Sequence, residues 1–275
     1  MVKRISAIAL LFALFFSDCT WAAQAKPLVL VSIAPQKQIV ERLAGDFIEV
    51  LVIIPATANP HVFEPTLTQA KAINRASLFL QIGHPELFFE QAIVEKFAST
   101  YSFKIVDTAK GIPLLADDPH VWTSPRAMLV MLKNSANALM ELLPEKKQAI
   151  EANLIQLEEQ VSALDRDLKI LFLNDQGKSF FVFHPAWGYF AKDYGLIQVA
   201  LEAHGKEPGT QHVMHVSDQA KLRGAKVLFT QLQTSSIAAQ TFTEDLHIKL
   251  EMLNPMEEDW FSNIRQSAEK IKNAL

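Results

Sequence analysis

The chain has 275 residues, of which 49% are hydrophobic and 20% are charged, as is usual for a packed globular protein. Its length suits one large domain or two small ones. The formal net charge of −4 at pH 7 leaves no excess of basic side chains for a polyanion, so we expect no nucleic-acid partner.

The N-terminal 25 residues have the features of a secretory signal peptide. Lys3 and Arg4 form a positively charged start, an apolar run follows at residues 5–16, and an A-x-A cleavage site ends at Ala25. The apolar run is shorter than the roughly 20 residues of a membrane-spanning helix, which disfavours a permanent anchor. We therefore expect residues 1–25 to be removed and the mature protein to be exported.

The single cysteine, Cys19, lies inside this predicted signal peptide. Lipid modification of Cys19 is an alternative to cleavage after Ala25, but Phe16 and Asp18 make a poor context for it. A mature chain without cysteine has no disulfides and depends on its core for stability. Any metal site in it must use histidine and carboxylate ligands.

The first half of the mature chain alternates short apolar runs with amphipathic stretches. Four runs predict β-strands, at residues 28–33, 47–54, 78–82 and 104–107. The stretches between them predict helices, at residues 35–43, 67–74 and about 86–97. Continuous apolar runs that alternate with helices are typical of parallel strands covered on both faces.

The second half repeats this alternation. The predicted strands are residues 180–183, 197–201, 226–230 and 247–253. The predicted helices lie near residues 187–193, 214–222, 234–243 and 257–271. We therefore expect an α/β protein with two lobes, each a mostly parallel four-stranded sheet with helices on both faces.

A long helix is predicted between the lobes, from Pro144 to Phe172, with the proline in its first turn. Its apolar residues recur at spacings of three and four: Ile150, Leu154, Leu157, Val161, Leu164, Leu168 and Leu171. Such a heptad stripe fits either a coiled-coil dimer or an internal strut. At about 43 Å the helix can run along both lobes, so we favour the rigid strut and a monomer. The expected boundaries are 26–143 for the N-terminal lobe, 144–174 for the linking helix and 175–275 for the C-terminal lobe.

Four histidines follow predicted strands, and one of them, His84, comes after the strand at residues 78–82. His61 and His120 each come after a proline, in stiff extended loops, and His184 ends the first strand of the second lobe. Ligands of open α/β sheets bind outside the carboxyl ends of the strands, and three imidazoles are a known zinc ligand set. The separations are not diagnostic alone, and the compact H-E-x-x-H zinc motif is absent.

The residues around these histidines carry a family resemblance. Residues 60–66 read P-H-V-F-E-P-T, residues 118–122 read D-P-H-V-W, and residues 182–196 read V-F-H-P-A-W-G-Y-F-A-K-D-Y-G-L. The three segments resemble the ligand motifs of zinc/manganese-binding periplasmic proteins of ABC importers, in the same order across the mature chain.

The resemblance implies that His61 and His120 of the first lobe bind a metal together with His184 of the second. In that family, histidine at the third position is associated with zinc and a carboxylate with manganese. Imidazole ligands also suit zinc better than manganese, which prefers oxygen. The implied transported ligand is therefore Zn²⁺, and the implied partner is the membrane permease of an ABC importer.

Two positions depart from the family pattern. Asn254 stands where the family commonly has an aspartate, and Gln231 stands where it commonly has a glutamate. The fourth ligand therefore stays open between Asn254, water and a nearby carboxylate, for which Glu64, Asp118 and Glu257 are candidates; for Glu64 we favour a loop-stabilising role. We expect weaker or more selective zinc binding than at a site completed by a carboxylate.

The remaining histidines have less specific settings. His204, His212 and His215 cluster in the second lobe, where we favour ordinary surface histidines over a second, weak metal site. His84 is a candidate for the cleft mouth, and His247 lies on a predicted strand with a structural role.

The sequence thus predicts a periplasmic protein that captures zinc in the cleft between its lobes and delivers it to an ABC permease. We expect no enzymatic activity. The alternatives are a paralogue for manganese or another divalent metal, and an adhesin-like relative with a weakened site. A secreted zinc hydrolase with Glu64 as general base is disfavoured because no hydrolase motif is present.

Overall fold

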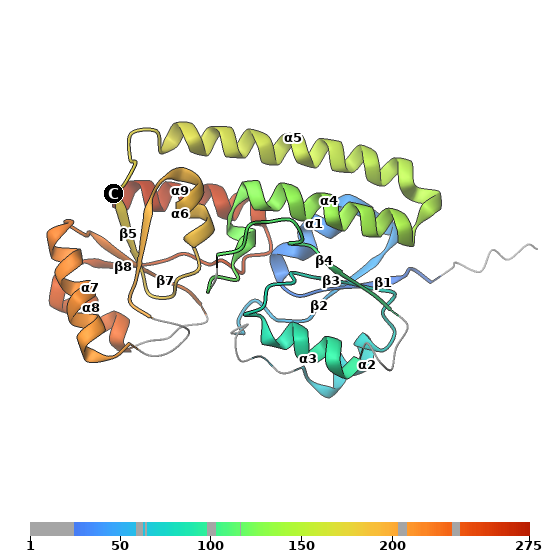
Figure 1. Cartoon of the computed structure of the whole chain (residues 1–275), viewed down its shortest axis with the longest axis horizontal. Helices are drawn as coiled ribbons and strands as arrows, with labels where there is room; N and C mark the ends of the chain where they lie inside the picture. The colour runs from blue at the N-terminus through green and yellow to red at the C-terminus, as the bar shows by residue number, and fades with distance from the viewer. Residues whose placement is uncertain are drawn as a thin grey trace, which may run out of the picture.

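The computed structural model describes residues 25–58, 63, 65–97, 103–115, 117–202, 208–232 and 237–275 (Figure 1). The predicted signal peptide, except its last residue, lies outside this range. Within the described residues, no helix combines the length and apolar character needed to cross a bilayer.

The N-terminal lobe contains a four-stranded sheet in which all neighbouring strands are parallel. The strand order is β2-β1-β3-β4, with β1 at Leu28–Val31, β2 at Glu49–Val52, β3 at Leu78–Gln81 and β4 at Lys104–Asp107. Helix α1 (Ala34–Ala44) lies on one side of the sheet, and α2 (Leu67–Ile73) and α3 (Phe88–Phe97) lie on the other (Figure 1). These elements confirm the predicted strands and helices of this lobe.

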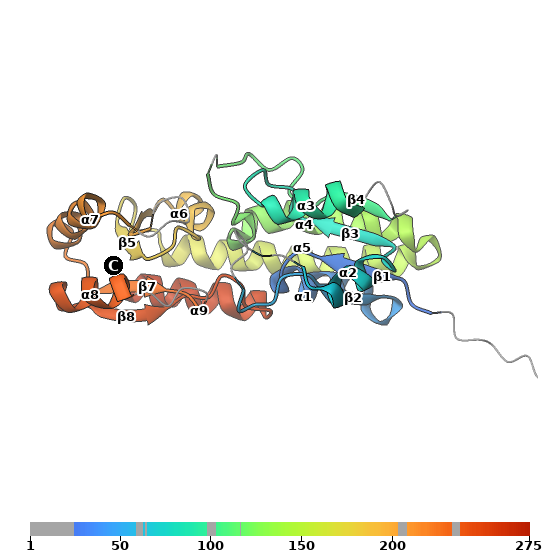
Figure 2. The same ribbon diagram turned by 90° about the horizontal axis from the view of Figure 1, so that it is seen from below.

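The C-terminal lobe repeats the arrangement with the order β6-β5-β7-β8, again all parallel. Its strands are β5 (Ser179–Val182), β6 (Ile197–Ala200), β7 (Val227–Thr230) and β8 (Lys249–Met252). Its helices are α6 (Gly188–Tyr194), α7 (Thr210–Leu222), α8 (Ile237–Leu246) and α9 (Trp260–Ala274). The two sheets lie side by side along the long axis of the molecule (Figure 2), which confirms the predicted two-lobed α/β fold.

Helix α4 (Pro125–Leu142) has no counterpart in the sequence-based prediction. Its start is well specified, because the Ser124 side chain accepts a hydrogen bond from the Ala127 backbone nitrogen (3.0 Å) and Pro125 occupies the first turn. A 3₁₀ turn at Pro144–Lys146 then reverses the chain into α5 (Lys147–Leu171). The two helices pack as an antiparallel hairpin, so α4 supplies the surface that α5 covers.

Helix α5 has 25 residues and extends over both sheets (Figure 1). It begins three residues later than expected, because the first predicted turn is the 3₁₀ turn. The heptad stripe faces α4, α1 and α9: its buried members are Ile150, Leu157, Val161, Leu164 and Leu168, and Leu154 and Leu171 are partly buried. Since the apolar face is covered within one chain, the strut is favoured over the coiled-coil dimer.

The two lobes are also braced by α9, which reaches from the C-terminal sheet to α1 of the N-terminal lobe. Gln38 on α1 donates from Nε2 to Asp259 Oδ1 (2.9 Å) and accepts a hydrogen bond from the Trp260 backbone nitrogen (3.0 Å). On the same helix, Lys37 pairs with Glu258 (2.8 Å). A relative movement of the lobes must therefore break polar contacts as well as slide helices.

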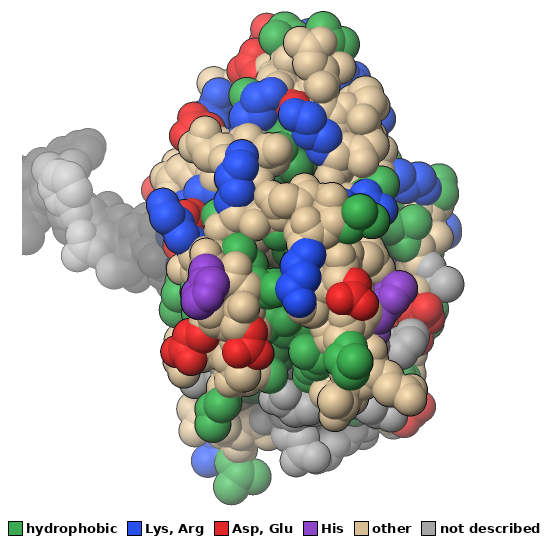
Figure 3. All heavy atoms as spheres, turned by 90° about the vertical axis from the view of Figure 1, so that its left-hand side faces the viewer, with side chains coloured by type: hydrophobic (Ala, Val, Ile, Leu, Met, Phe, Trp, Pro, Cys, Tyr) green, Lys and Arg blue, Asp and Glu red, His purple; other side chains and the backbone are tan. Residues whose placement is uncertain are grey.

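Both acidic and basic side chains lie on the end face of the C-terminal lobe (Figure 3). That face therefore presents no purely basic surface, in line with the near-balanced charge of the sequence.

A buried carboxylate, Glu90 on α3, joins the carboxyl ends of β1 and β3. Its Oε1 accepts hydrogen bonds from the Ser32 hydroxyl and from the Ile82 backbone nitrogen (2.7 Å), and its Oε2 accepts from the Gly83 backbone nitrogen (2.7 Å). Burial raises the pKa of Glu90 from 4.5 to about 7, against the lowering effect of these hydrogen bonds. Asp107 adds a smaller upward contribution.

We predict that Glu90 makes the stability of the fold fall as pH rises. Between pH 4.5 and about pH 7 the folded protein holds a proton on Glu90 that the unfolded chain releases, so stability declines across this window. The total decline from this group is about 3 kcal/mol. Urea unfolding of wild type and Glu90→Gln over this pH range measures it: the difference in unfolding free energy should change with pH, whereas exposed Glu95→Gln serves as a control with no such change. A pH-independent difference for Glu90→Gln would contradict the prediction.

Candidate metal site

His120 and His184 approach each other from opposite lobes. His120 immediately precedes the 3₁₀ turn η2 (Val121–Thr123), and His184 lies two residues beyond the end of β5. Their Nε2 atoms are 3.3 Å apart, and their ring planes are inclined by 80°. Both side chains are buried. The third predicted ligand, His61, falls outside the described residues, as does Glu64.

Asp118 sets the orientation of His120. Asp118 Oδ1 accepts hydrogen bonds from both the backbone nitrogen (2.9 Å) and the ring Nδ1 (2.7 Å) of His120. A ring that donates from Nδ1 is the tautomer that carries its metal-binding lone pair on Nε2. Burial lowers the pKa of His120, with smaller downward contributions from His184 and His84, and this favours the neutral, metal-binding form over the upward effect of Asp118.

The tryptophan of the same motif ties His120 to the opposite lobe. Trp122 Nε1 donates to the Pro255 carbonyl oxygen (2.8 Å), and Trp260 Nε1 donates to the Trp122 carbonyl oxygen (2.6 Å). The Trp122 ring also packs beside the His120 ring, with centroids 5.1 Å apart. The position of His120 therefore depends on residues that follow β8 in the other lobe.

His184 has its own carboxylate partner, Glu202, which the sequence analysis missed. Glu202 Oε2 lies 2.9 Å from His184 Nδ1. The pairing of β5 and β6 continues past their ends, because Leu201 donates to the Val182 carbonyl oxygen (2.9 Å) and Glu202 donates to that of Phe183 (2.8 Å). The sequence contained a partial indication of this pair, because Glu202 follows the predicted strand at residues 197–201 and His184 follows the predicted strand at residues 180–183. Only the strand order and register make the two neighbours.

Asp118 is enclosed by the opposite lobe. A Cβ atom added to Gly188, the first residue of α6, would lie 2.3 Å from Asp118 Oδ2. Next to this contact, the Tyr189 hydroxyl accepts a hydrogen bond from the Leu115 backbone nitrogen (2.8 Å). The C-terminal lobe thus supports the carboxylate that orients a histidine of the N-terminal lobe.

The candidates for a fourth ligand have other partners in the structure. Asn254 accepts a hydrogen bond from the Met256 backbone nitrogen (3.1 Å) and donates to Glu257 Oε2 (3.2 Å). Gln231 and His184 line one small cavity next to Trp187. In the described part of the chain, no group of three His, Cys, Asp or Glu side chains could hold a metal ion.

Two of the other histidines, His84 and His247, lie in defined local settings. His84 accepts from the Glu86 backbone nitrogen at Nδ1 (3.2 Å) and lies 3.2 Å from the Leu115 carbonyl oxygen at Nε2, so both of its ring nitrogens are engaged. His247 precedes β8 with a φ of 53°, so the prediction that it lies on the strand is wrong.

Two members of the predicted histidine cluster in the second lobe, His212 and His215, have contacts in the structure. His212 Nε2 lies 3.1 Å from the Ala200 carbonyl oxygen, and His215 contacts Gln219 on the same helix (2.7 Å). His204 lies outside the described residues.

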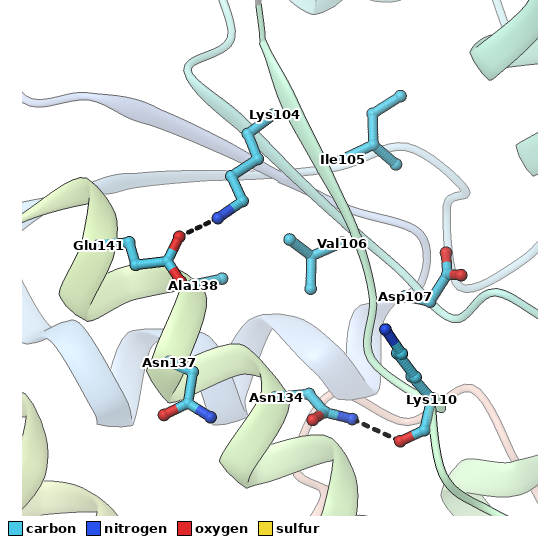
Figure 4. A pocket seen from close by; sticks show the side chains of 9 residues that line it. All are labelled: Lys104, Ile105, Val106, Asp107, Lys110, Asn134, Asn137, Ala138 and Glu141. Carbon is cyan, nitrogen blue, oxygen red and sulfur yellow. Dashed lines mark hydrogen bonds and ion pairs between the residues drawn. The ribbon is translucent and has the colours of Figure 1, made fainter.

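A groove between β4 and α4 is a separate feature (Figure 4). Lys104 forms an ion pair with Glu141 across it, and Asn134 donates to the Lys110 carbonyl oxygen (2.9 Å). None of its described lining residues is a histidine. Since these polar groups are paired with each other, we assign the groove no metal.

Comparisons with known proteins identify the family of this chain. A family model described as "Zinc-uptake complex component A periplasmic" (ZnuA) matches residues 29–274. A crystal structure of ZnuA superimposes with a TM-score of 0.85 and 34% identity, covering 90% of this chain and 99% of that one. These matches define a class, the metal-binding solute-binding proteins of ABC importers, which transport rather than catalyse. The chain belongs to the ZnuA family of periplasmic zinc-uptake components.

Curated relatives are more distant. Zinc-binding protein AdcA of Streptococcus pyogenes serotype M3 is 25% identical over 318 residues, which cover 99% of this chain and 61% of AdcA. A putative metal-binding protein of Chlamydia trachomatis serovar D is 27% identical over 280 residues, which cover 96% of this chain and 99% of that protein. The chain therefore spans about three fifths of the length of AdcA.

We predict that Gly188→Ala weakens metal binding without unfolding the protein. The new methyl group would collide with Asp118 Oδ2 and push the carboxylate away from His120. Loss of such a supporting hydrogen bond lowers metal affinity about 10-fold or more. Competition with a chromophoric zinc chelator measures the effect. Gly209→Ala is the matched control, because a Cβ there meets no atom within 4 Å; equal affinities of the two variants would contradict the prediction.

Proposed function

We propose that this protein captures Zn²⁺ in the cleft between its lobes and delivers it to the membrane permease of an ABC importer. His61, His120 and His184 are the proposed ligands. The mature protein is a periplasmic monomer, released from its signal peptide by cleavage near Ala25. In this proposal residues 26–143 and 175–275 form the two lobes, and residues 144–174 link them.

The observation that carries the proposal is the distance between the two imidazoles. Nitrogens bound at 2.0–2.1 Å to one tetrahedral zinc ion lie about 3.3–3.4 Å apart. His120 Nε2 and His184 Nε2 are 3.3 Å apart, and both rings meet a carboxylate at Nδ1. The pair therefore has the spacing of two ligands on one edge of a tetrahedron, and a ring that donates from Nδ1 carries its metal-binding lone pair on Nε2.

The choice of zinc follows from the ligand type and from relatives. Neutral imidazole nitrogen is a good ligand for zinc, whereas manganese prefers carboxylate and water oxygens. The matching family is named for zinc uptake, and AdcA is named as a zinc-binding protein. Water or the Asn254 side chain completes the coordination in this proposal.

We predict that wild-type protein purified under mild conditions carries one zinc per chain. His120→Ala and His184→Ala should each lose it, because each removes a ligand from the edge formed by the two Nε2 atoms. Metal content by mass spectrometry checks this, with the exposed His215→Ala on α7 as the control that keeps its zinc. A metal-free wild type, or zinc retained by both ligand variants, would reject the proposed function.

We also predict that Asn254→Asp tightens zinc binding. The substitution places a carboxylate where the family commonly has one, and it adds negative charge beside a proposed ligand set of three neutral imidazoles. A gain of about 1.4 kcal/mol corresponds to 10-fold tighter binding. Chelator competition should show such a gain, while Asn137→Asp on the exposed face of α4 adds the same charge without effect. Equal affinities for wild type and Asn254→Asp would remove the argument.

A further inference from the structure

A buried carboxylate, Glu202, and a partly buried one, Asp118, flank the histidine pair, and each belongs to the same lobe as the histidine that it contacts. Asp118 lies beside His120 Nδ1 (2.7 Å), and Glu202 lies beside His184 Nδ1 (2.9 Å). The side chain of Glu202 is 9% exposed. A carboxylate removed from water in this way requires a strong partner, and in the described structure the ring of His184 provides it.

The positive charge of the proposed Zn²⁺ ligand suggests a role for these two carboxylates. Three neutral imidazoles leave both positive charges of a divalent ion uncompensated, and an uncompensated charge away from water is costly. The neutral amides of Asn254 and Gln231 cannot offset it. The outer carboxylates Asp118 and Glu202 together carry two negative charges, one from each lobe.

We propose that Glu202 is a positioning residue for zinc capture. Its hydrogen bond holds the His184 ring as the tautomer protonated at Nδ1 and directs Nε2 toward the ion. Its charge, with that of Asp118, balances the divalent ion that the ligands themselves leave uncompensated. This inference rests on the proposed function. Because Glu202 contacts Nδ1 and His120 lies at Nε2, Glu202 acts through His184 rather than on the metal.

The backbone explains why Glu202 is suited to this role. Its nitrogen donates to the Phe183 carbonyl oxygen (2.8 Å), a backbone hydrogen bond between the residues that follow β5 and β6, just beyond the last ladder pair Val182–Ala200. A backbone hydrogen bond thus fixes the main chain of Glu202, while its Oε2 atom lies 2.9 Å from His184 Nδ1. A side chain on an unpaired loop would lack this fixed starting point.

Two substitutions separate the charge of Glu202 from its geometry. Glu202→Gln removes the charge but keeps a carbonyl oxygen that can accept from Nδ1. Glu202→Asp keeps the charge but withdraws the carboxylate by one methylene from the ring. Exposed Glu244→Gln on α8 removes a charge from the same lobe and is the matched control.

The experiment measures zinc dissociation constants by chelator competition and the visible absorption of the Co²⁺-loaded proteins. We expect both Glu202 variants to bind zinc about 10- to 100-fold more weakly than wild type. The Co²⁺ spectrum should change for Glu202→Asp, whose His184 ring is free to turn, and should stay close to wild type for Glu202→Gln. Glu244→Gln should match wild type in both measurements. Urea unfolding of the metal-free proteins checks that both Glu202 variants are folded.

Two results would overturn the inference. Wild-type affinity in both Glu202 variants would show that neither the charge nor the hydrogen bond matters, while the proposed function would stand. Weaker binding that tracks an equal loss of metal-free stability, with an unchanged Co²⁺ spectrum in Glu202→Asp, would show a role in folding alone. A wild type that binds no zinc would instead reject the proposed function, and this inference with it.

Discussion

The approach of His120 to His184 depends on the fixed spacing of the two lobes, because each histidine belongs to a different lobe. Nitrogens 3.3 Å apart tolerate little relative movement if they are to share one ion. Helix α5 holds this spacing through its packing on α1 and α9, and α9 adds direct contacts to Gln38. The helices that cover both sheets therefore fix the position of the two histidines as well as burying the hydrophobic core.

The short distance between the two Nε2 atoms also explains the contacts that surround the histidines. Each ring is oriented by a carboxylate from its own lobe, while Gly188 and Trp122 make contacts across the lobes. The orientation of each imidazole ring is thus set within its own lobe, whereas the distance between the two rings depends on contacts between the lobes. In the proposed site, Asn254 and Gln231 stand where carboxylates are expected, and Asp118 and Glu202 would supply negative charge from behind the histidines.

Much of the fold could be predicted, because strands and helices differ in the period of their apolar residues. All eight described strands fall within or beside the predicted runs. Helix α4 was not predicted, although Ser124 caps it and Pro125 occupies its first turn. The stripe of α5 was recognised, but its partner was ambiguous: a heptad pattern does not say whether the covering surface belongs to the same chain.

By itself, the sequence determined the alternation of elements, the family motifs and the histidines within them, because these depend on the order of residues along the chain. Only the tertiary structure decided that His120 Nε2 faces His184 Nε2, that His84 is engaged by backbone groups, and that Glu202 stands beside His184. The physical reason is that such contacts join residues distant along the chain. Strand order, register and the packing of one lobe on the other fix them, and no local pattern records those three.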